Sequence, residues 1–399
     1  MKKNLLIILT YCLCLPLLAQ TDTQVTDTLP WPQNLRARID SVLTTPLLQT
    51  TQIGLMVYDL TADSALYTYG HRQRLRPAST MKLLTAITAL DRLGEDCRLT
   101  TTLNYMGTIE RGTLCGNISC TGGMDPLLDM SDMRYFVNQL RHQGIDTIRG
   151  RIFSNMSFKE DNAFGEGWCW DDDNPVLSPL LVEGKDNFAE TLRRELRRDG
   201  VVIIDTVVSQ SLRARNLKWR QVCSRSHTIG EVLVKMMKDS NNLFAESVFY
   251  QLAAREGGLP ARAKQAVNAV KRMIQKVGLQ PGDYRVADGS GLSLYNYVSA
   301  ELEVQMLRYA YHHQGVFGQL YTVLPLAGVD GTLKSRMKKT AAEGNVRAKT
   351  GSVSGISSLA GYCRAANGHT LCFAIINQGV SSMSDGRQMQ DRLCVAMCQ

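Results

Sequence analysis

A change in the spacing of apolar residues divides this 399-residue chain. Between residues 97 and 221, apolar residues come in short alternating runs separated by Gly and Asp, a pattern typical of strands. Residues 21–96 and 222–399 instead combine helical patterns with strands. The sequence therefore predicts an α+β domain made of the two outer segments, with helices flanking an antiparallel sheet, and a strand-rich domain inserted at 97–221.

The first outer segment carries a serine at a predicted helix start. Residues 53–60 and 66–69 have the composition of paired strands. A helix is predicted from Thr80, because apolar residues recur with helical spacing up to Leu90 and Gly94 follows. Ser79 therefore lies at the N-terminus of this helix.

Two further helices are predicted at the start of the second outer segment. A helical pattern covers residues 229–237, breaks at 239–242 and resumes at 243–252. The break predicts a short loop between two helices.

The C-terminal part has the pattern of a sheet followed by a helix. Residues 347–350 form a predicted strand, and 356–364 and 370–377 flank Asn367-Gly368, a pair typical of hairpin turns. Asp385 is expected to cap a final helix.

The N-terminus reads as a secretory signal peptide. Within residues 1–20, Lys2 and Lys3 precede an apolar stretch, and Ala19 is a small residue suited to cleavage. The later sequence has no apolar run long enough to cross a bilayer. We therefore expect an exported protein of the periplasm or cell envelope, with no transmembrane segment after cleavage.

Composition excludes several classes of protein. A hydrophobic content of 44% is incompatible with global disorder. The formal net charge is +8, or +6 without Lys2 and Lys3, and the basic residues are dispersed, so nucleic acid is not an expected partner.

Cysteines and histidines give no metal pattern. The chain lacks C-x-x-C and H-E-x-x-H, so neither a metal nor a cofactor is predicted. Nine cysteines remain after signal cleavage, an odd number. Cys115 with Cys120 and Cys363 with Cys372 could lie on facing strands, but unpaired buried thiols are an equal alternative.

Ser79 begins an S-x-x-K motif. On a helix, residues three apart share a face, so the Lys82 amine should lie beside the Ser79 hydroxyl. A neutral Lys82 could then act as a base, provided that burial or a nearby cation lowers its pKa. S-x-x-K is common by chance, and Ser335 to Lys338 is a second copy.

Two later motifs distinguish the first copy from the second. Ser240-Asn241-Asn242 lies in the predicted loop between helices, and Lys349-Thr350-Gly351 lies on the predicted strand. We interpret Ser79 as the nucleophile, Lys82 as its base, and Ser240 as the group that passes a proton to a leaving amine.

The remaining motif residues suit substrate binding. Asn242 can hold a substrate amide, while Lys349 and Thr350 of the K-T-G can bind a carboxylate. The backbone N–H groups of Ser79 and of Ser352, which follows Gly351, can stabilise an oxyanion. Lys349 should also help to keep Lys82 neutral.

With these three motifs in this order, the sequence resembles the D-alanyl-D-alanine carboxypeptidases of the class C low-molecular-mass penicillin-binding proteins, the S13 peptidases. The resemblance covers essentially the whole mature chain. Three further segments match the family's pattern: GGMDP at 122–126, DGSGLS at 288–293 and LPLAGVDGT at 324–332.

The resemblance implies a serine-type hydrolase that cleaves the terminal D-Ala-D-Ala bond of peptidoglycan stem peptides through an acyl-serine, with cleavage of the D-Ala cross-link as a second activity open to the same residues. β-Lactams would be covalent inhibitors. Two alternatives stay open: a serine β-lactamase, which shares the nucleophile and fold, and a non-catalytic peptidoglycan-binding or scaffold protein.

Two other features have competing interpretations. Trp168, Trp170 and Asp171–Asp173 could line the cleft and meet a substrate amine, or could simply fix a loop. His227 could serve as a triad base, but Lys82 already fills that role, so a structural histidine is favoured.

Overall fold

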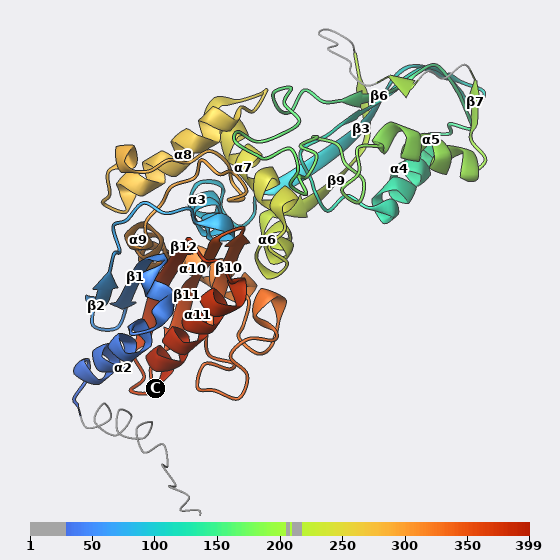
Figure 1. Cartoon of the computed structure of the whole chain (residues 1–399). Helices are drawn as coiled ribbons and strands as arrows, with labels where there is room; N and C mark the ends of the chain where they lie inside the picture. The colour runs from blue at the N-terminus through green and yellow to red at the C-terminus, as the bar shows by residue number, and fades with distance from the viewer. Residues whose placement is uncertain (1–28, 205–207, 210–217) are drawn as a thin grey trace, which may run out of the picture.

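The chain forms two β-sheets with a layer of helices between them (Figure 1). The computed structural model describes residues 29–204, 208–209 and 218–399. The predicted signal peptide lies outside the described residues. One sheet is built from both ends of the chain and the other from its middle part.

The first sheet has five antiparallel strands in the order β10-β11-β12-β1-β2. Its members are β1 (Gln52–Asp59), β2 (Ser64–Tyr69), β10 (Arg347–Val353), β11 (Ile356–Arg364) and β12 (Thr370–Gln378). The predicted strands and the hairpin at Asn367-Gly368 are confirmed. Strand β10 lies at an edge of the sheet, so one side of its backbone is unpaired within the sheet.

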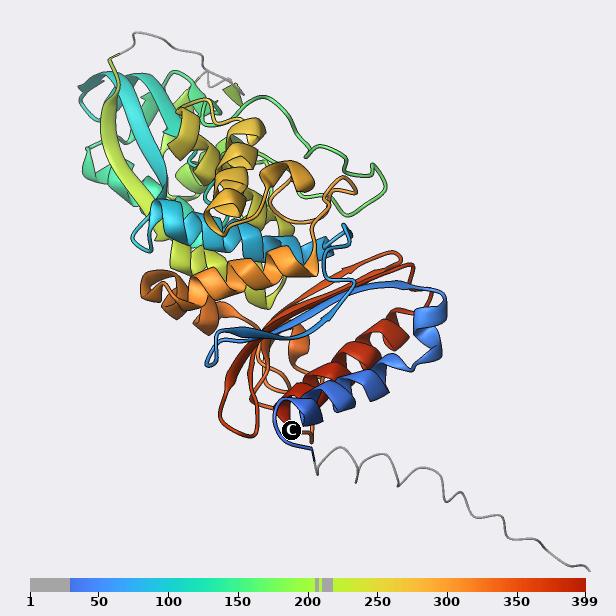
Figure 2. The same cartoon turned by 90° about the vertical axis from the view of Figure 1, so that its left-hand side faces the viewer.

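Helices cover both faces of this sheet, which explains why its strands are apolar on both sides. In β1, Leu55 and Val57 belong to one core cluster, while Met56 and Tyr58 belong to another. Helices α2 (Gln33–Leu43) and α11 (Met383–Cys398) lie side by side on the first face (Figure 2).

The cap of α11 differs from the prediction. The Ser382 side chain caps the helix by accepting from the backbone N–H of Asp385. Asp385 itself lies in the first turn, where its negative charge suits the helix dipole. The predicted cap was therefore wrong, because serine and aspartate are both good N-caps and three residues separate them here.

The second face is covered by α9 (Ala300–Tyr311), with α3 (Met81–Leu93) reaching β10. The other central helices complete this layer, and they are α6 (Ile229–Lys238), α7 (Asn242–Gly257), α8 (Ala263–Lys276) and α10 (Gln314–Val323). Helix α7 is buried on nearly all sides and packs against α3 and α8. Both the helix predicted from Thr80 and the pair broken at 239–242 are confirmed, with a short 3₁₀ turn, Ala78–Thr80, ahead of α3.

The second sheet is formed by the middle of the chain. Its main path is β7-β5-β4-β3-β9, and β6 pairs with β4 and with β8. The strands are β3 (Arg98–Glu110), β4 (Thr113–Thr121), β5 (Thr147–Arg149), β6 (Ile152–Asn155), β7 (Val202–Ile204), β8 (Val208–Ser209) and β9 (Arg220–Thr228). The predicted boundary at residue 221 thus falls inside β9.

Two helices pack with this sheet. They are α4 (Met130–His142) and α5 (Phe188–Arg198), whose Phe136 and Phe188 rings meet at 6.2 Å in the core of this part. The strand-rich prediction missed α4. Its start is marked by a capping box between Asp129 and Asp132.

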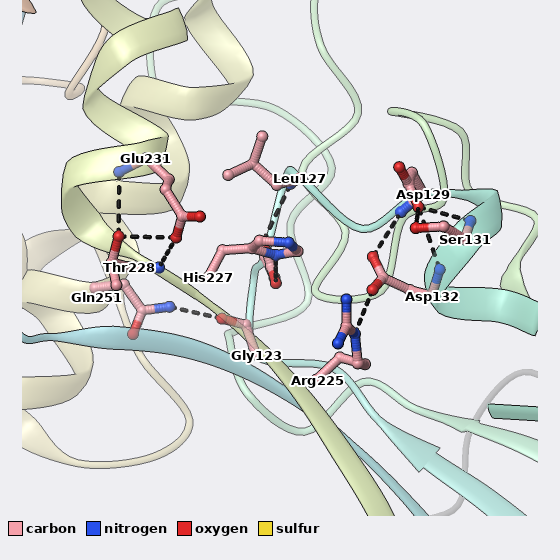
Figure 3. Close-up of polar contacts among 11 residues, drawn as sticks. Gly123, Leu127, Asp129, Ser131, Asp132, Arg225, His227, Thr228, Glu231 and Gln251 are labelled. Atoms are coloured by element: carbon pink, nitrogen blue, oxygen red, sulfur yellow. Dashed lines mark hydrogen bonds and ion pairs between the residues drawn. The ribbon is translucent and has the colours of Figure 1, made fainter. Parts of the chain in front are cut away.

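Polar contacts join the second sheet to the central helices (Figure 3). The amide of Gln251 on α7 donates to the carbonyl oxygen of Gly123 at 2.6 Å. At the end of β9, His227 Nδ1 lies 2.8 Å from the buried carboxylate of Asp125, and Thr228 then caps α6. These contacts support the structural interpretation of His227.

The described cysteines, nine in number, are all free thiols. Cys115 and Cys120 lie on one strand, β4, so the idea that they face each other was wrong. Cys363 and Cys372 are on neighbouring strands, but they belong to different core clusters.

The described part of the chain contains neither a membrane-spanning helix nor a metal-binding cluster. None of its helices is both long and apolar enough to cross a bilayer. The same residues contain no group of three or more side chains arranged to hold a metal ion.

The burial of Phe373 in the core beside the first sheet predicts a large loss of stability when its ring is removed. Phe373 on β12 is fully buried between the sheet and α11, so we expect Phe373→Ala to lower the free energy of unfolding by about 3–5 kcal/mol. Urea unfolding followed by circular dichroism measures this loss. The control is Phe164→Ala at a 56% exposed position, which should change stability little; equal effects of the two substitutions would contradict the prediction.

Candidate active site

The three sequence motifs meet where α3, the α6–α7 loop and the edge strand β10 converge. Ser79 lies in the 3₁₀ turn before α3, and Lys82 is in the first turn of that helix. Ser240 lies between α6 and α7, and Lys349 is on β10. These elements come from distant parts of the sequence, so the site depends on the fold.

Lys82 is the hydrogen-bonding centre of this site. Its Nζ lies 2.9 Å from Ser79 Oγ, 2.7 Å from Asn242 Oδ1 and 2.8 Å from the carbonyl oxygen of Ser290. The side chain is fully buried. The three partners therefore account for all three donors of the ammonium.

Burial changes the acidity of this ammonium. Loss of water lowers the pKa of Lys82 to about 7, although the carboxylates of Asp288 and Glu246 act in the opposite direction. Near neutral pH a substantial fraction of Lys82 is therefore the free amine. The free amine can accept the proton of the Ser79 hydroxyl across the same 2.9 Å contact.

A second buried lysine holds the other hydroxyl of the site. Lys349 Nζ donates to Ser240 Oγ at 2.7 Å and to the carbonyl oxygen of Thr350 at 2.8 Å. Burial and the nearby charge of Lys82 hold the pKa of Lys349 well below its usual range. For Lys82, burial is the cause that lowers the pKa.

Ser240 has an unusual backbone conformation. Its φ is +57°, a region that a residue with a side chain seldom adopts. Such strain is characteristic of functional sites, where the surrounding structure fixes a side chain in place. The loop thereby presents the Ser240 hydroxyl to Lys349.

The remaining residues predicted to bind substrate lie along β10. Thr350 is half-buried and shares a hydrogen bond of 2.8 Å with the hydroxyl of Thr332, while Ser352 is exposed. Gly351 packs directly on the turn that carries Ser79. A Cβ atom there would lie 2.6 Å from the carbonyl oxygen of Pro77 and 3.0 Å from the Ser79 nitrogen.

The second S-x-x-K copy has a different environment. Ser335 and Lys338 are both exposed, beyond the 3₁₀ turn Gly331–Leu333. Burial of the lysine therefore distinguishes the two copies.

Two buried carboxylates support the site, and the sequence analysis gave neither a role. Asp288 accepts five hydrogen bonds, from the Gly291 and Ser293 nitrogens and from the Trp168, Ser290 and Asn296 side chains. Glu246 on α7 accepts from the Gly289 and Ser290 nitrogens. The sequence holds one signal that Glu246 has a special role, because it is a charged residue within an apolar helical pattern.

The tryptophan-rich segment is partly explained. Trp168 Nε1 donates to Asp288 Oδ2 at 2.9 Å, so this side chain fixes its loop against residues 288–293. Trp170 is instead 93% exposed, and Asp171–Asp173 are exposed beside it. The structure thus gives Trp168 a positioning contact.

The approach of Gly351 to Ser79 generates a prediction. Gly351→Ala should reduce the rate at which a fluorescent penicillin labels Ser79 by roughly 100-fold or more, because β10 must move away from the nucleophile. Labelling on a gel over time measures the rate. Gly315→Ala is a matched control, since nothing lies near its Cβ position, and it should label normally. Normal labelling of both variants would contradict the close approach.

Comparison with known proteins gives consistent relatives. A curated D-alanyl-D-alanine carboxypeptidase, DacB of Haemophilus influenzae, is 25% identical over 86% of this chain and 88% of its own. A D-alanyl-D-alanine carboxypeptidase of Actinomadura sp. is 26% identical over 92% of this chain and 84% of its own.

Solved structures show the same fold. The crystal structure of penicillin binding protein 4 from Haemophilus influenzae superimposes with a TM-score of 0.81 and 23% identity, and covers 89% of this chain and 99% of that one. The family model described as D-Ala-D-Ala carboxypeptidase 3 (S13) matches residues 35–180 and 181–398. The chain therefore belongs to the D-Ala-D-Ala carboxypeptidase 3 (S13) family.

Proposed function

We propose that this protein is a serine-type D-Ala-D-Ala carboxypeptidase that acts on peptidoglycan stem peptides and is acylated by β-lactams. The observation that carries the proposal is the 2.9 Å contact between Ser79 Oγ and the fully buried Lys82 amine. A hydroxyl beside an amine with a lowered pKa is an activated nucleophile. Family membership and the names of the relatives support this substrate class.

Acylation follows from the geometry. Lys82 removes the Ser79 proton as Oγ attacks the carbonyl carbon of the penultimate D-Ala. Ser240, hydrogen-bonded to Lys349, gives its hydroxyl proton to the departing D-Ala amine and receives in exchange the proton that Lys82 took up, so that both groups return to their starting states. Peptide bond cleavage leaves the acyl group on Ser79, and hydrolysis of that ester by water regenerates the free hydroxyl.

Substrate binding uses the edge strand. A peptide can lie along β10, where backbone groups are unpaired within the sheet. The N–H groups of Ser79 and Ser352 stabilise the oxyanion, and Gly351 allows this part of β10 to approach the Ser79 nitrogen. Thr350 and Lys349 suit the terminal carboxylate, and Asn242 suits a substrate amide. None of these steps requires a cofactor or a metal.

The place of action agrees with the predicted signal peptide. Peptidoglycan lies outside the cytoplasm, so an exported protein of the periplasm or cell envelope can reach it. Cleavage of the D-Ala cross-link would use the same residues as carboxypeptidase action. The preference between the two depends on what the cleft admits beyond the scissile bond.

Loss of the nucleophile tests the proposal directly. Ser79→Ala should abolish both D-Ala release from a stem pentapeptide and the mass increase after benzylpenicillin treatment. The matched control, Ser335→Ala in the second S-x-x-K, should keep both activities. D-Ala release by Ser79→Ala would refute the assignment, and rapid turnover of a chromogenic cephalosporin by the unmodified protein would favour a β-lactamase instead.

The acidity of Lys82 predicts how acylation depends on pH. Since only the free amine accepts a proton, the rate constant for benzylpenicillin acylation should fall about tenfold per pH unit below a pKa of about 7. Above that pH the rate should level off. Time-resolved intact mass between about pH 5 and pH 9 measures the curve. A rate that stays constant down to pH 5 would contradict Lys82 as the base.

A further inference from the structure

Glu246 is a fully buried acid beside this machinery with no part in the mechanism above. It lies on α7 one helical turn after Asn242, so both side chains project from the same face. Its exposed fraction is 1%. An isolated carboxyl in such a place destabilises a fold, so its presence calls for a compensating contact.

Hydrogen bonds connect Glu246 to the proposed base through a single peptide segment. Glu246 Oε1 accepts from the Gly289 nitrogen at 3.1 Å and from the Ser290 nitrogen at 2.8 Å. The carbonyl oxygen of the same Ser290 accepts from Lys82 Nζ at 2.8 Å. From α3, Thr85 Oγ1 donates to the Gly289 carbonyl oxygen at 2.7 Å, which holds the segment from the other side.

Several charged groups surround this segment. Lys82 faces Glu246 from α3, and Asp288 faces it from the segment itself. On its own helix, Glu246 helps to raise the pKa of Tyr250. Lys349, from β10, interacts with Lys82. Two buried carboxyl groups therefore lie around the Lys82 amine, and a second buried lysine interacts with it.

We infer that Glu246 is a positioning residue of this active site, which fixes the Ser290 peptide against Lys82 and places a buried carboxyl group close to the amine. The inference rests on the proposed function. Glu246 acts on Lys82 through the Ser290 peptide and not by contact with Ser79.

The electrostatic interaction between Lys82 and Glu246 acts in both directions. Desolvation lowers the pKa of Lys82, whereas Asp288 and Glu246 raise it. Burial and Asp288 raise the pKa of Glu246, while Lys82 and the bonds from Ser290 lower it. Lys82 and Glu246 are thus a coupled pair, and each charge favours the other.

Removal of the Glu246 charge should change the pKa of Lys82 in a defined direction. In Glu246→Gln the amide oxygen can accept the same two backbone N–H groups, but the negative charge is gone. The pKa of Lys82 should then fall, so the free amine persists to lower pH. The acid limb of the benzylpenicillin acylation profile should move about one pH unit lower, and the maximal rate should drop several-fold because the base is weaker.

Two further variants separate charge from structure. Glu246→Asp keeps the charge but shortens the arm, so the maximal rate should drop while the acid limb stays in place. Glu303→Gln is the control for burial: Glu303 on α9 is also fully buried, and burial raises its pKa to about 8. Glu303 is not one of the charges that act on Lys82, so removal of its carboxyl group should leave the pH profile of acylation unchanged.

The outcomes distinguish this inference from the proposed function. An acid limb that is unmoved in Glu246→Gln, or that moves as far in Glu303→Gln, overturns the role of Glu246 alone. If Glu246→Gln does not fold, a shift of about one pH unit in Glu246→Asp overturns it as well. No acylation of the unmodified protein at any pH would overturn the proposed function, and this inference with it.

Discussion

The site depends on a lysine amine held out of water. Lys82 on α3 is fully buried, and its three hydrogen bonds go to the 3₁₀ turn before α3, to α7 and to the segment before α9. An ammonium in this environment tolerates little displacement, because each lost partner leaves a buried donor unpaired. The packing of α3, α7, the 3₁₀ turn and one connecting segment is therefore fixed around a single nitrogen atom.

The middle part of the chain contributes to this arrangement although it forms its own sheet. Trp168 belongs to the segment between β6 and α5, and its indole N–H reaches Asp288 at 2.9 Å. Asp288 in turn accepts backbone N–H groups of the segment that carries Ser290. The second sheet is thus connected through two side chains to the surroundings of Lys82.

Much of this architecture could be predicted from the sequence, because periodicity and turn residues are local signals. The strands of the first sheet, the helix after Ser79 and the hairpin at Asn367-Gly368 all followed from such patterns. Family membership and the α+β fold were also predicted correctly. The roles of Ser79, Lys82, Ser240, Asn242 and the K-T-G strand stay predictions, although the structure brings these residues together.

The features that were missed depend on tertiary contacts. Glu246 accepts from the backbone N–H groups of Gly289 and Ser290, and Asp288 accepts from the Trp168 indole. These partners are distant in sequence, and no spacing rule reveals them. The prediction that Cys115 and Cys120 lie on facing strands was wrong, because both residues lie on β4. The cap at Ser382 was missed because residue type alone does not decide which of two capable side chains is used.

Strand β10 has a consequence beyond its proposed role in substrate binding. Residues 325–327 pair with the outer edge at its start, but the rest of this edge is unpaired within the sheet, and sheet edges of this kind also accept strands from other copies of a chain. Most proteins protect such an edge with charged side chains, but the Lys349 ammonium is turned inward and buried here. At the start of β10, the Arg347 side chain remains partly exposed and lies over the Tyr321 ring. Protection of the unpaired part of β10 against pairing with another copy of the chain therefore depends on the surrounding loops.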